Sequence, residues 1–198
     1  MSGLALRLPP VRLEAAEAVL YPAYLEDADA LFDTVMADVD WKQEELTLYG
    51  RRIAQPRLSA WYGDAAYAYS GLHLDPRPWP PVLADLRDRC AAIARAPFNS
   101  VLANLYRDGA DSMDWHADDE ASLGPAPVIA SISLGAARRF QMRRKDRRGE
   151  AICTELGNGD VLVMSGRCQT DWLHRVPKTK KPVGPRINLT FRNIINSP

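Results

Sequence analysis

A change of pattern near residue 99 restricts the fold of this chain more than any other feature. Before it, residues 25–39 and 82–94 have the apolar spacing of amphipathic helices, and Pro80-Pro81 starts the second helix. After it, short strand-like runs alternate with turn signals such as Gly135 and Asn158-Gly159. The expected strands are 100–106, 128–134, 138–143, 151–155, 160–164, 171–176 and 186–194. This order predicts an α+β, mostly β domain, a jelly roll of two sheets with N-terminal helices packed on one sheet.

The composition is consistent with one globular domain over residues 1–198. The hydrophobic fraction of 46% and the charged fraction of 25% are ordinary for such proteins. No stretch reaches the apolar length of a membrane span, and the N-terminus lacks the pattern of a secretory signal. The three cysteines Cys90, Cys153 and Cys168 have no metal-binding spacing. We therefore expect a cytoplasmic protein that does not contact membranes, and we expect it to be a monomer.

Two of the three histidines of the chain belong to a possible metal-binding pattern. His116 and Asp118 are two residues apart, so on a strand their side chains point to the same face. His174, brought in by the fold, would complete the facial triad of non-haem Fe(II) oxygenases. A bare H-x-D also occurs by chance, and zinc accepts the same ligands. Surface or hydrogen-bonded histidines therefore remain an alternative at this point.

The run Arg186-Ile187-Asn188-Leu189-Thr190-Phe191-Arg192 alternates polar and apolar residues without a break. As a strand it places Arg186, Asn188, Thr190 and Arg192 on one face and the apolar residues on the other. Two arginines on one face indicate a buried anion, because a guanidinium binds a carboxylate through two hydrogen bonds. The alternative is an edge strand with a solvated charged face. Asn104 and Tyr106 share another strand face and could donate hydrogen bonds to an acid.

These segments together resemble the AlkB family of Fe(II)/2-oxoglutarate dioxygenases. The resemblance runs over residues 45–195 and is carried by Phe98–Gly109, Trp115–Glu120, Ile129–Gly135 and Pro185–Arg192. Upstream, Pro56-Arg57, Trp61–Asp64 and Tyr69–Leu72 resemble the subgroup that repairs alkylated DNA, including duplex DNA. The resemblance implies that residues 96–198 form the catalytic jelly-roll core. Residues 1–95 would be an N-terminal extension with helices and nucleotide-recognition elements.

The resemblance also implies a role for each site residue. His116, Asp118 and His174 would bind Fe(II), and Arg186 would pair with the distal carboxylate of 2-oxoglutarate. The other co-substrate contacts would be Asn104, Tyr106, Asn188, Thr190 and Arg192. The substrate contacts would be Trp61, Tyr67, Tyr69, Ser70, Asp119 and Glu120, with one of the two tyrosines and His116 enclosing a flipped base. Tyr49 would be an aromatic wedge that fills the gap left by that base, or else an ordinary half-buried strand tyrosine.

The charge distribution indicates a nucleic-acid partner although the net charge is zero. Residues 1–50 carry ten acidic and three basic residues, whereas residues 138–192 carry fourteen basic and five acidic ones. The basic residues cluster at Arg138-Arg139, at 143–148 and at Lys178, Lys180 and Lys181. Such clusters can neutralise phosphates, although a solvated basic loop would look the same.

The resemblance implies an enzyme that uses Fe(II), 2-oxoglutarate and O2 to remove alkyl groups from DNA bases such as N1-methyladenine and N3-methylcytosine. Formaldehyde, succinate and CO2 would be released. One alternative keeps this chemistry but acts on RNA, a protein side chain or a small molecule. A second is a non-catalytic nucleic-acid-binding module, which would not need the triad and Arg186 together. A third, a zinc hydrolase, leaves Arg186 unexplained and lacks a common zinc-protease signature.

Overall fold

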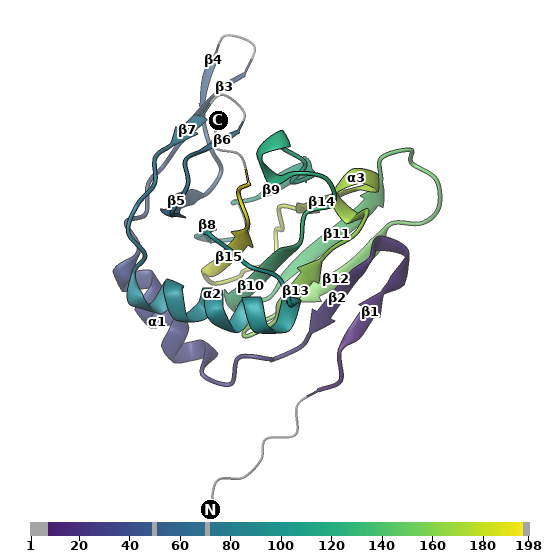
Figure 1. The fold of residues 1–198 in the computed structure, drawn as a ribbon, viewed down its shortest axis with the longest axis horizontal. Coiled ribbons are helices and arrows are strands. Elements are labelled where there is room, and N and C mark those ends of the chain that lie inside the picture. Colours follow the sequence, from purple (N-terminus) through teal and green to yellow (C-terminus); the bar gives the residue numbers. More distant parts are fainter. Residues whose placement is uncertain (1–7, 49–50, 70–71, 196–198) are drawn as a thin grey trace, which may run out of the picture.

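The computed structural model describes residues 8–48, 51–69 and 72–195, and this part of the chain forms two antiparallel sheets and two small ribbons (Figure 1). The larger sheet has the order β1 (Val11–Leu13), β2 (Ala18–Tyr21), β13 (Val161–Met164), β10 (Ile129–Gly135), β15 (Arg186–Arg192), β8 (Ser100–Tyr106) and β5 (Leu58–Gly63). The smaller sheet has the order β12 (Ile152–Leu156), β11 (Arg138–Arg144), β14 (Trp172–Val176) and β9 (Met113–His116). The ribbons are β3 (Glu45–Leu48) with β4 (Arg51–Ala54) and β6 (Tyr67–Tyr69) with β7 (Leu72–Leu74). The predicted jelly roll is confirmed.

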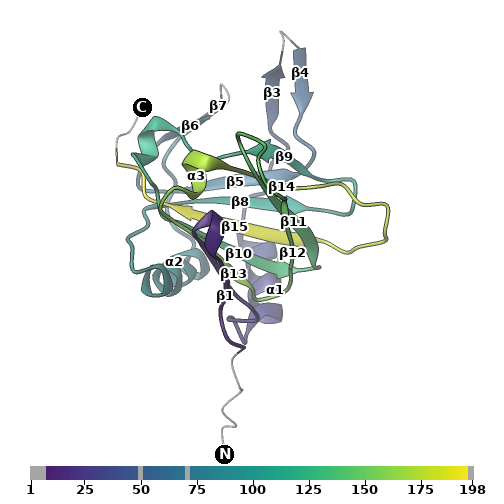
Figure 2. The same cartoon turned by 90° about the vertical axis from the view of Figure 1, so that its right-hand side faces the viewer.

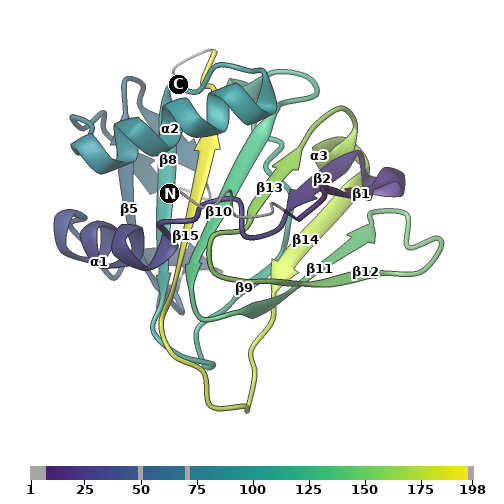
Figure 3. The ribbon, with the colours of Figure 1, turned by 90° about the horizontal axis from the view of Figure 1, so that it is seen from below.

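Two longer helices cover one face of the larger sheet. α1 (Ala28–Asp38) and α2 (Pro81–Ala94) lie across β5, β8, β15 and β10 (Figure 3). A short helix, α3 (Cys168–Asp171), precedes β14, and the single-turn segments η1 (Glu14–Ala16) and η2 (Ala121–Leu123) connect other strands. The two ribbons lie at the end of the molecule away from α1, at the top of Figures 1 and 2.

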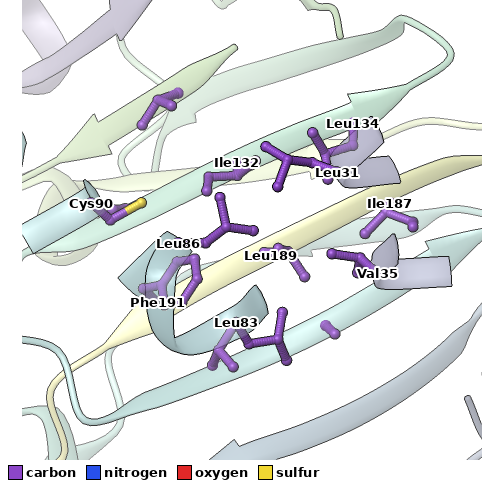
Figure 4. Close-up of a cluster of buried hydrophobic side chains, with 14 of the residues drawn as sticks. Leu31, Val35, Leu83, Leu86, Cys90, Ile132, Leu134, Ile187, Leu189 and Phe191 are labelled. Carbon is purple, nitrogen blue, oxygen red and sulfur yellow. The ribbon is translucent and has the colours of Figure 1, made fainter. Parts of the chain in front are cut away.

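The main hydrophobic core lies between these helices and the sheet. On β15 the alternating pattern places Ile187, Leu189 and Phe191 in this core, all fully buried. From the helices, Val35 and Leu86 meet them (Figure 4). Because neighbouring residues of a strand point to opposite faces, the polar residues of β15 are turned toward the smaller sheet. The core therefore sets which face of β15 can build a site.

A second apolar cluster fills the space between the two sheets. It joins Phe140 and Met142 of β11 to Leu162 and Met164 of β13, together with Trp172 of β14. Its members Phe140 and Met164 also line the cavity described below.

Several element boundaries differ from the predicted ones. The first helix begins at Ala28 and not at residue 25, and the N–H of Leu25 donates to the carbonyl of Gly159 in the β12–β13 turn at 3.0 Å. The strands predicted at 100–106 and within 128–194 are present with ends shifted by up to two residues.

The early strands β1, β2 and β5, and also β9, were not predicted. The larger sheet therefore takes strands from both sides of residue 95, where the catalytic core was expected to begin.

Within the described part of the chain, no helix has both the length and the apolar character needed to cross a membrane.

Candidate metal centre and acid-binding cavity

Three metal-binding side chains meet where β9 ends beside β14. His116 is the last residue of β9 and pairs with His174 of β14, and their ring centroids are 4.2 Å apart. Asp118 follows two residues later. Candidate ligand atoms of the three side chains all lie within 4.8 Å of one another. The fold thus brings together the three residues that the sequence singled out.

Asp118 was predicted to lie on the same strand as His116, but the structure positions it in another way. β9 ends at His116, so His116 and Asp118 do not share the face of one strand. Two hydrogen bonds place the aspartate instead. Its N–H donates to Oε1 of Gln169 at 2.9 Å, and Arg192 Nη2 donates to its Oδ1 at 2.8 Å. The helix α3 thus holds the backbone of Asp118 and the strand β15 holds its carboxylate, and both are distant from Asp118 in the sequence.

The protonation states of Asp118 and His174 suit metal binding. Burial alone would raise the pKa of Asp118, but the charges of Arg192, His174 and His116 outweigh burial and lower this pKa to about 2. Burial and the adjacent His116 lower the pKa of His174 to about 3. At neutral pH the site therefore offers a carboxylate and a neutral imidazole, which are the forms that bind metals.

The orientation of His116 also suits a metal ligand. Its Nδ1 lies 2.8 Å from the carbonyl oxygen of Asp114. A carbonyl only accepts hydrogen bonds, so Nδ1 carries a proton, and in the neutral ring Nε2 is the atom with the free lone pair. Such a bond to the second ring nitrogen is a common means of orienting a metal-bound histidine.

Arg186 provides a buried cation in the same cavity. It lies on β15 and is 1% exposed. Nη2 donates to Oγ of Ser133 at 2.8 Å, and the guanidinium carbon lies 5.3 Å from the ring centre of Tyr106. Among the described residues, Arg186 Nε and Nη1 have no hydrogen-bond partner although both atoms are buried. Burial lowers the pKa of this group. Unpaired buried donors of this kind are costly unless an acceptor binds them.

All six residues predicted to contact the co-substrate line one cavity with the triad. They are Asn104, Tyr106, Arg186, Asn188, Thr190 and Arg192. Two of them are bonded to each other, since Thr190 Oγ1 donates to Asn188 Oδ1 at 3.1 Å. Asn188 Nδ2 in turn donates to Ser131 Oγ at 2.7 Å. The polar face of β15 therefore forms a continuous wall from Arg186 to the metal ligands.

Sequence reasoning assigned no role to two residues that orient this wall. Arg57, 3% exposed, donates from Nε to Oδ1 of Asn104 at 2.7 Å, so the amide nitrogen of Asn104 is the group left for other partners. Gln169, 1% exposed, holds Asp118 as described. Arg57 was noted only within the segment that resembles the DNA-repair subgroup, and its role was not predictable because it and Gln169 each contact a residue about fifty positions away.

The predicted substrate contact Trp61 is buried in the interior of the fold. Trp61 is 2% exposed and lies in a small apolar cluster with Leu102, Leu123 and Ile194. Its Nε1 donates to the carbonyl of Ala65 at 3.2 Å. Its cluster neighbour Leu102 also lines the cavity.

The other predicted substrate residues have varied outcomes. Asp119 forms an ion pair with Lys145 at 2.7 Å, and Oε2 of Glu120 is buried without a partner among the described residues. Tyr67 and Tyr69 belong to β6, but their side chains lie outside the described part of the structure. Tyr49 and Ser70 lie outside the described residues altogether.

The basic clusters divide into buried and exposed members. Arg138 was expected to face phosphates, but it is 2% exposed and donates to the backbone carbonyls of Asp108, Asp111 and Pro177. That expectation is wrong for Arg138, because strand alternation turns it inward while Arg139 turns outward. Arg139 lines a separate groove with Lys178 and Lys181.

The donor set fits the group that the triad suggests. Two imidazoles and one carboxylate form the facial triad that binds Fe(II) and leaves further coordination positions open. The unpaired donors of Arg186 in the same cavity fit the carboxylate of an acid bound beside the metal. Both halves of the site therefore match an iron centre that uses an acidic co-substrate.

Comparisons with known proteins agree with this geometry. Residues 17–192 match the family model described as the 2OG-Fe(II) oxygenase superfamily. The alpha-ketoglutarate-dependent dioxygenase alkB homolog 3 of Mus musculus is 45% identical over 190 residues, which are 90% of this chain and 66% of that protein. The chain thus spans slightly less than two thirds of this relative.

Two further matches support the assignment. The DNA oxidative demethylase ALKBH2 of Mus musculus is 40% identical over 181 residues, which are 85% of this chain and 76% of that protein. The solved structure of OsALKBH1 superposes with a TM-score of 0.66 at 18% identity, covering 93% of this chain and 100% of that one, so it supports the fold. From the family match and these relatives, the chain belongs to the AlkB family within the 2OG-Fe(II) oxygenase superfamily.

Proposed function

We propose that this chain is an oxidative dealkylase that removes alkyl groups from base nitrogens in DNA, with N1-methyladenine and N3-methylcytosine as substrates. One observation carries the proposal. The triad of His116, Asp118 and His174 shares a cavity with Arg186, whose buried donors lack partners among the described residues. A non-catalytic binding module would have no use for this combination.

The residues of the cavity have separate roles in binding the metal and the co-substrate. His116, Asp118 and His174 hold Fe(II), and Arg186 pairs with the distal carboxylate of 2-oxoglutarate. Bound Fe(II), 2-oxoglutarate and O2 supply the oxidation of the N-alkyl carbon, with release of succinate, CO2 and formaldehyde. The protein contributes position and exclusion of water.

Further residues on the cavity wall orient the co-substrate. Asn104 presents its amide nitrogen to a co-substrate oxygen, because Arg57 occupies its amide oxygen. Tyr106 offers its phenol to the same acid. Arg192 donates to Asp118, so it lies where the metal-chelating end of the co-substrate would bind. Asn188 and Thr190 complete the wall through their mutual hydrogen bond.

The choice of DNA bases is supported by the relatives and by the charge distribution. ALKBH2 of Mus musculus is named a DNA oxidative demethylase. A groove lined by Arg139, Arg175, Lys178 and Lys181 could bind phosphates on the smaller sheet. RNA is the second candidate, since a basic groove does not distinguish the two backbones.

The substrate pocket is assigned from the sequence. Tyr67 or Tyr69, with His116, would enclose the flipped base, and Tyr49 and Ser70 would contact the nucleic acid nearby. Asp119 and Glu120 would add negative charge at the base edge, which suits lesions that carry a positive charge. The ribbons β3–β4 and β6–β7 lie at the same end of the molecule, and they would form the nucleotide-recognition elements of the extension (Figure 2).

The remaining assignments concern the whole chain. We propose that residues 1–198 act as one catalytic domain, as a monomer in the cytoplasm. The three cysteines Cys90, Cys153 and Cys168 are free, which fits a reducing compartment.

A direct assay tests the proposed function. The protein is incubated with Fe(II), ascorbate and 2-oxoglutarate, together with single- or double-stranded oligonucleotides that carry one N1-methyladenine. Mass spectrometry of the oligonucleotide follows loss of the methyl group, and succinate is measured in the same sample. We expect loss of the methyl group in the wild type and none in His116→Ala.

The two readouts separate the alternatives. Succinate formation without demethylation of DNA, but with demethylation of an RNA oligonucleotide, would replace DNA by RNA as the substrate. Absence of succinate and of demethylation in the wild type would reject the enzymatic proposal as a whole.

A further inference from the structure

An aromatic ring and two guanidinium groups meet on the outer face of the smaller sheet. The guanidinium carbon of Arg143 lies 4.2 Å from the ring centre of Trp115, and that of Arg175 lies 4.4 Å from the same ring. Both distances are well inside the range of cation–π attraction. We call Trp115, Arg143 and Arg175 the Trp115 stack.

The stack joins three strands. Trp115 belongs to β9, Arg175 to the adjacent β14, and Arg143 to β11 on the far side of β14 (Figure 2). Arg175 is held further, since its Nε donates to Oε1 of Gln141 at 2.8 Å. Within the described part of the chain, Nε of Arg143 is buried and has no hydrogen-bond partner. The indole ring is thus the contact that the structure gives for this guanidinium group.

Each member of the stack is the immediate neighbour of a residue on the inner face. Trp115 precedes His116, and Arg175 follows His174. Arg143 follows Met142, which pairs with His174 in the strand register. Because strand residues alternate between faces, the stack lies directly behind the two histidines of the metal centre. A shift of β9 along β14 would therefore move His116 relative to His174.

Backbone pairing alone constrains β9 weakly. It is a four-residue strand at the edge of its sheet, and its register with β14 shifts between the pairs His174–His116 and Val176–Met113. Short edge strands with such irregularities have a poorly specified register unless side chains fix it. The carbonyl of Asp114, which orients His116, belongs to the same strand.

We propose that Trp115 is a positioning residue for the metal centre, and that its two cation–π contacts hold β9 in the register that aligns His116 with His174. It acts through the strand and touches neither metal nor substrate. The proposal rests on the proposed function only in requiring that the triad binds a divalent metal.

Metal affinity tests the proposal without turnover. Trp115→Leu removes the ring, and Trp115→Phe keeps an aromatic face for both guanidiniums. Calorimetric titration of the purified chains with Co(II) measures affinity, and the visible spectrum of bound Co(II) reports its coordination geometry. Loss of an interaction that orients a metal ligand weakens metal binding by about tenfold or more. We expect about a tenfold weaker affinity and an altered spectrum for Trp115→Leu, with near wild-type values for Trp115→Phe.

Trp79 provides a matched control. Arg87 lies 5.0 Å from its ring centre, and its Nε1 donates to Asp64 Oδ1 at 3.1 Å, so it carries a similar contact away from the cavity. Trp79→Leu should leave Co(II) affinity and spectrum unchanged. A thermal melt of each apo variant shows whether the chain is folded.

Each outcome decides a different point. A folded Trp115→Leu with wild-type Co(II) affinity and spectrum overturns the proposal and leaves the proposed function intact. Failure of the wild type to bind Co(II) overturns the proposed function itself. If Trp115→Leu does not fold, Arg143→Met decides instead, because it keeps the alkyl chain and removes one cation. That variant should weaken Co(II) binding severalfold, and unchanged binding overturns the proposal.

Discussion

At the scale of single residues, the site depends on how its buried charged groups are paired. Asp118 is bound by Arg192, whereas Arg186 keeps two unpaired donors among the described residues. The first arrangement holds a metal ligand in place. The second leaves two hydrogen-bond donors that a bound acid can pair. Unpaired buried donors destabilise the folded protein by about 1–3 kcal/mol each. Ligand binding and local stability are therefore linked at the same residues.

Outside the site, Asp111 should make stability depend on pH. It is 4% exposed and accepts hydrogen bonds from the N–H, Nε and Nη2 of Arg107. Burial would raise the pKa of Asp111, but Arg107 outweighs burial and the pKa is lowered. A lowered folded-state pKa stabilises the protein above the unfolded value near 3.8, and this contribution is lost as the pH falls through the folded pKa.

We therefore expect Asp111→Asn to lower the free energy of unfolding by about 1–3 kcal/mol at pH 7. The difference from wild type should shrink as the pH drops below about 4, because protonated wild-type Asp111 no longer carries a charge. Urea unfolding between pH 3 and 7 measures this. A difference that is constant over the range would mean that charge is not the cause.

At the scale of elements, β15 serves the core and the site at once. Its apolar residues pack under α1 and α2, and its polar residues line the cavity (Figure 4). A strand can do this because its side chains alternate between faces. A shift of one residue in its pairing with β8 or β10 would exchange the two sets, so the core protects the register of the site.

Shortening a side chain on the core face of β15 should therefore destabilise the folded protein. Leu189 is fully buried between α2 and the sheet. Leu189→Ala should lower the free energy of unfolding by about 2–5 kcal/mol, from lost burial and the cavity left behind. Chemical denaturation measures this change. Thr190→Ala, on the opposite face of the same strand, is the matched comparison and should cost clearly less; equal losses would contradict the division of the two faces.

At the scale of the whole molecule, the N-terminal segment completes the larger sheet. β2 pairs with β13 along its full length, and Ala18 and Leu20 enter the cluster between the sheets. Without β2, the edge of β13 would lie open to pairing with other chains. The segment therefore contributes to the fold although none of its described residues lines the cavity.

We expect deletion of residues 8–22 to lower the melting temperature and to promote aggregation, because it exposes β13 and removes part of an apolar cluster. Differential scanning calorimetry and light scattering measure the two effects. A milder variant, Leu20→Ala, should lower the melting temperature without opening the edge. If the deletion melts like the wild type, β2 does not support the sheet.

Local patterns in the sequence were enough for much of the fold and for the chemical identity of the site. The alternation of β15 and the run 100–106 predicted strands that the structure contains, because the period of side chains follows from backbone geometry alone. The triad residues and Arg186 were identifiable because few residue types bind metals or carboxylates. The same pattern reasoning failed for Asp118, which lies beyond the end of β9.

Tertiary structure decided what depends on contacts between distant segments. Arg57 orients Asn104, Gln169 and Arg192 hold Asp118, and Trp115 meets two arginines from other strands. It also turned Arg138 inward and placed Trp61 in a packing cluster. These outcomes depend on strand order and register, which arise from packing the whole core, and so no local run of residues contains them.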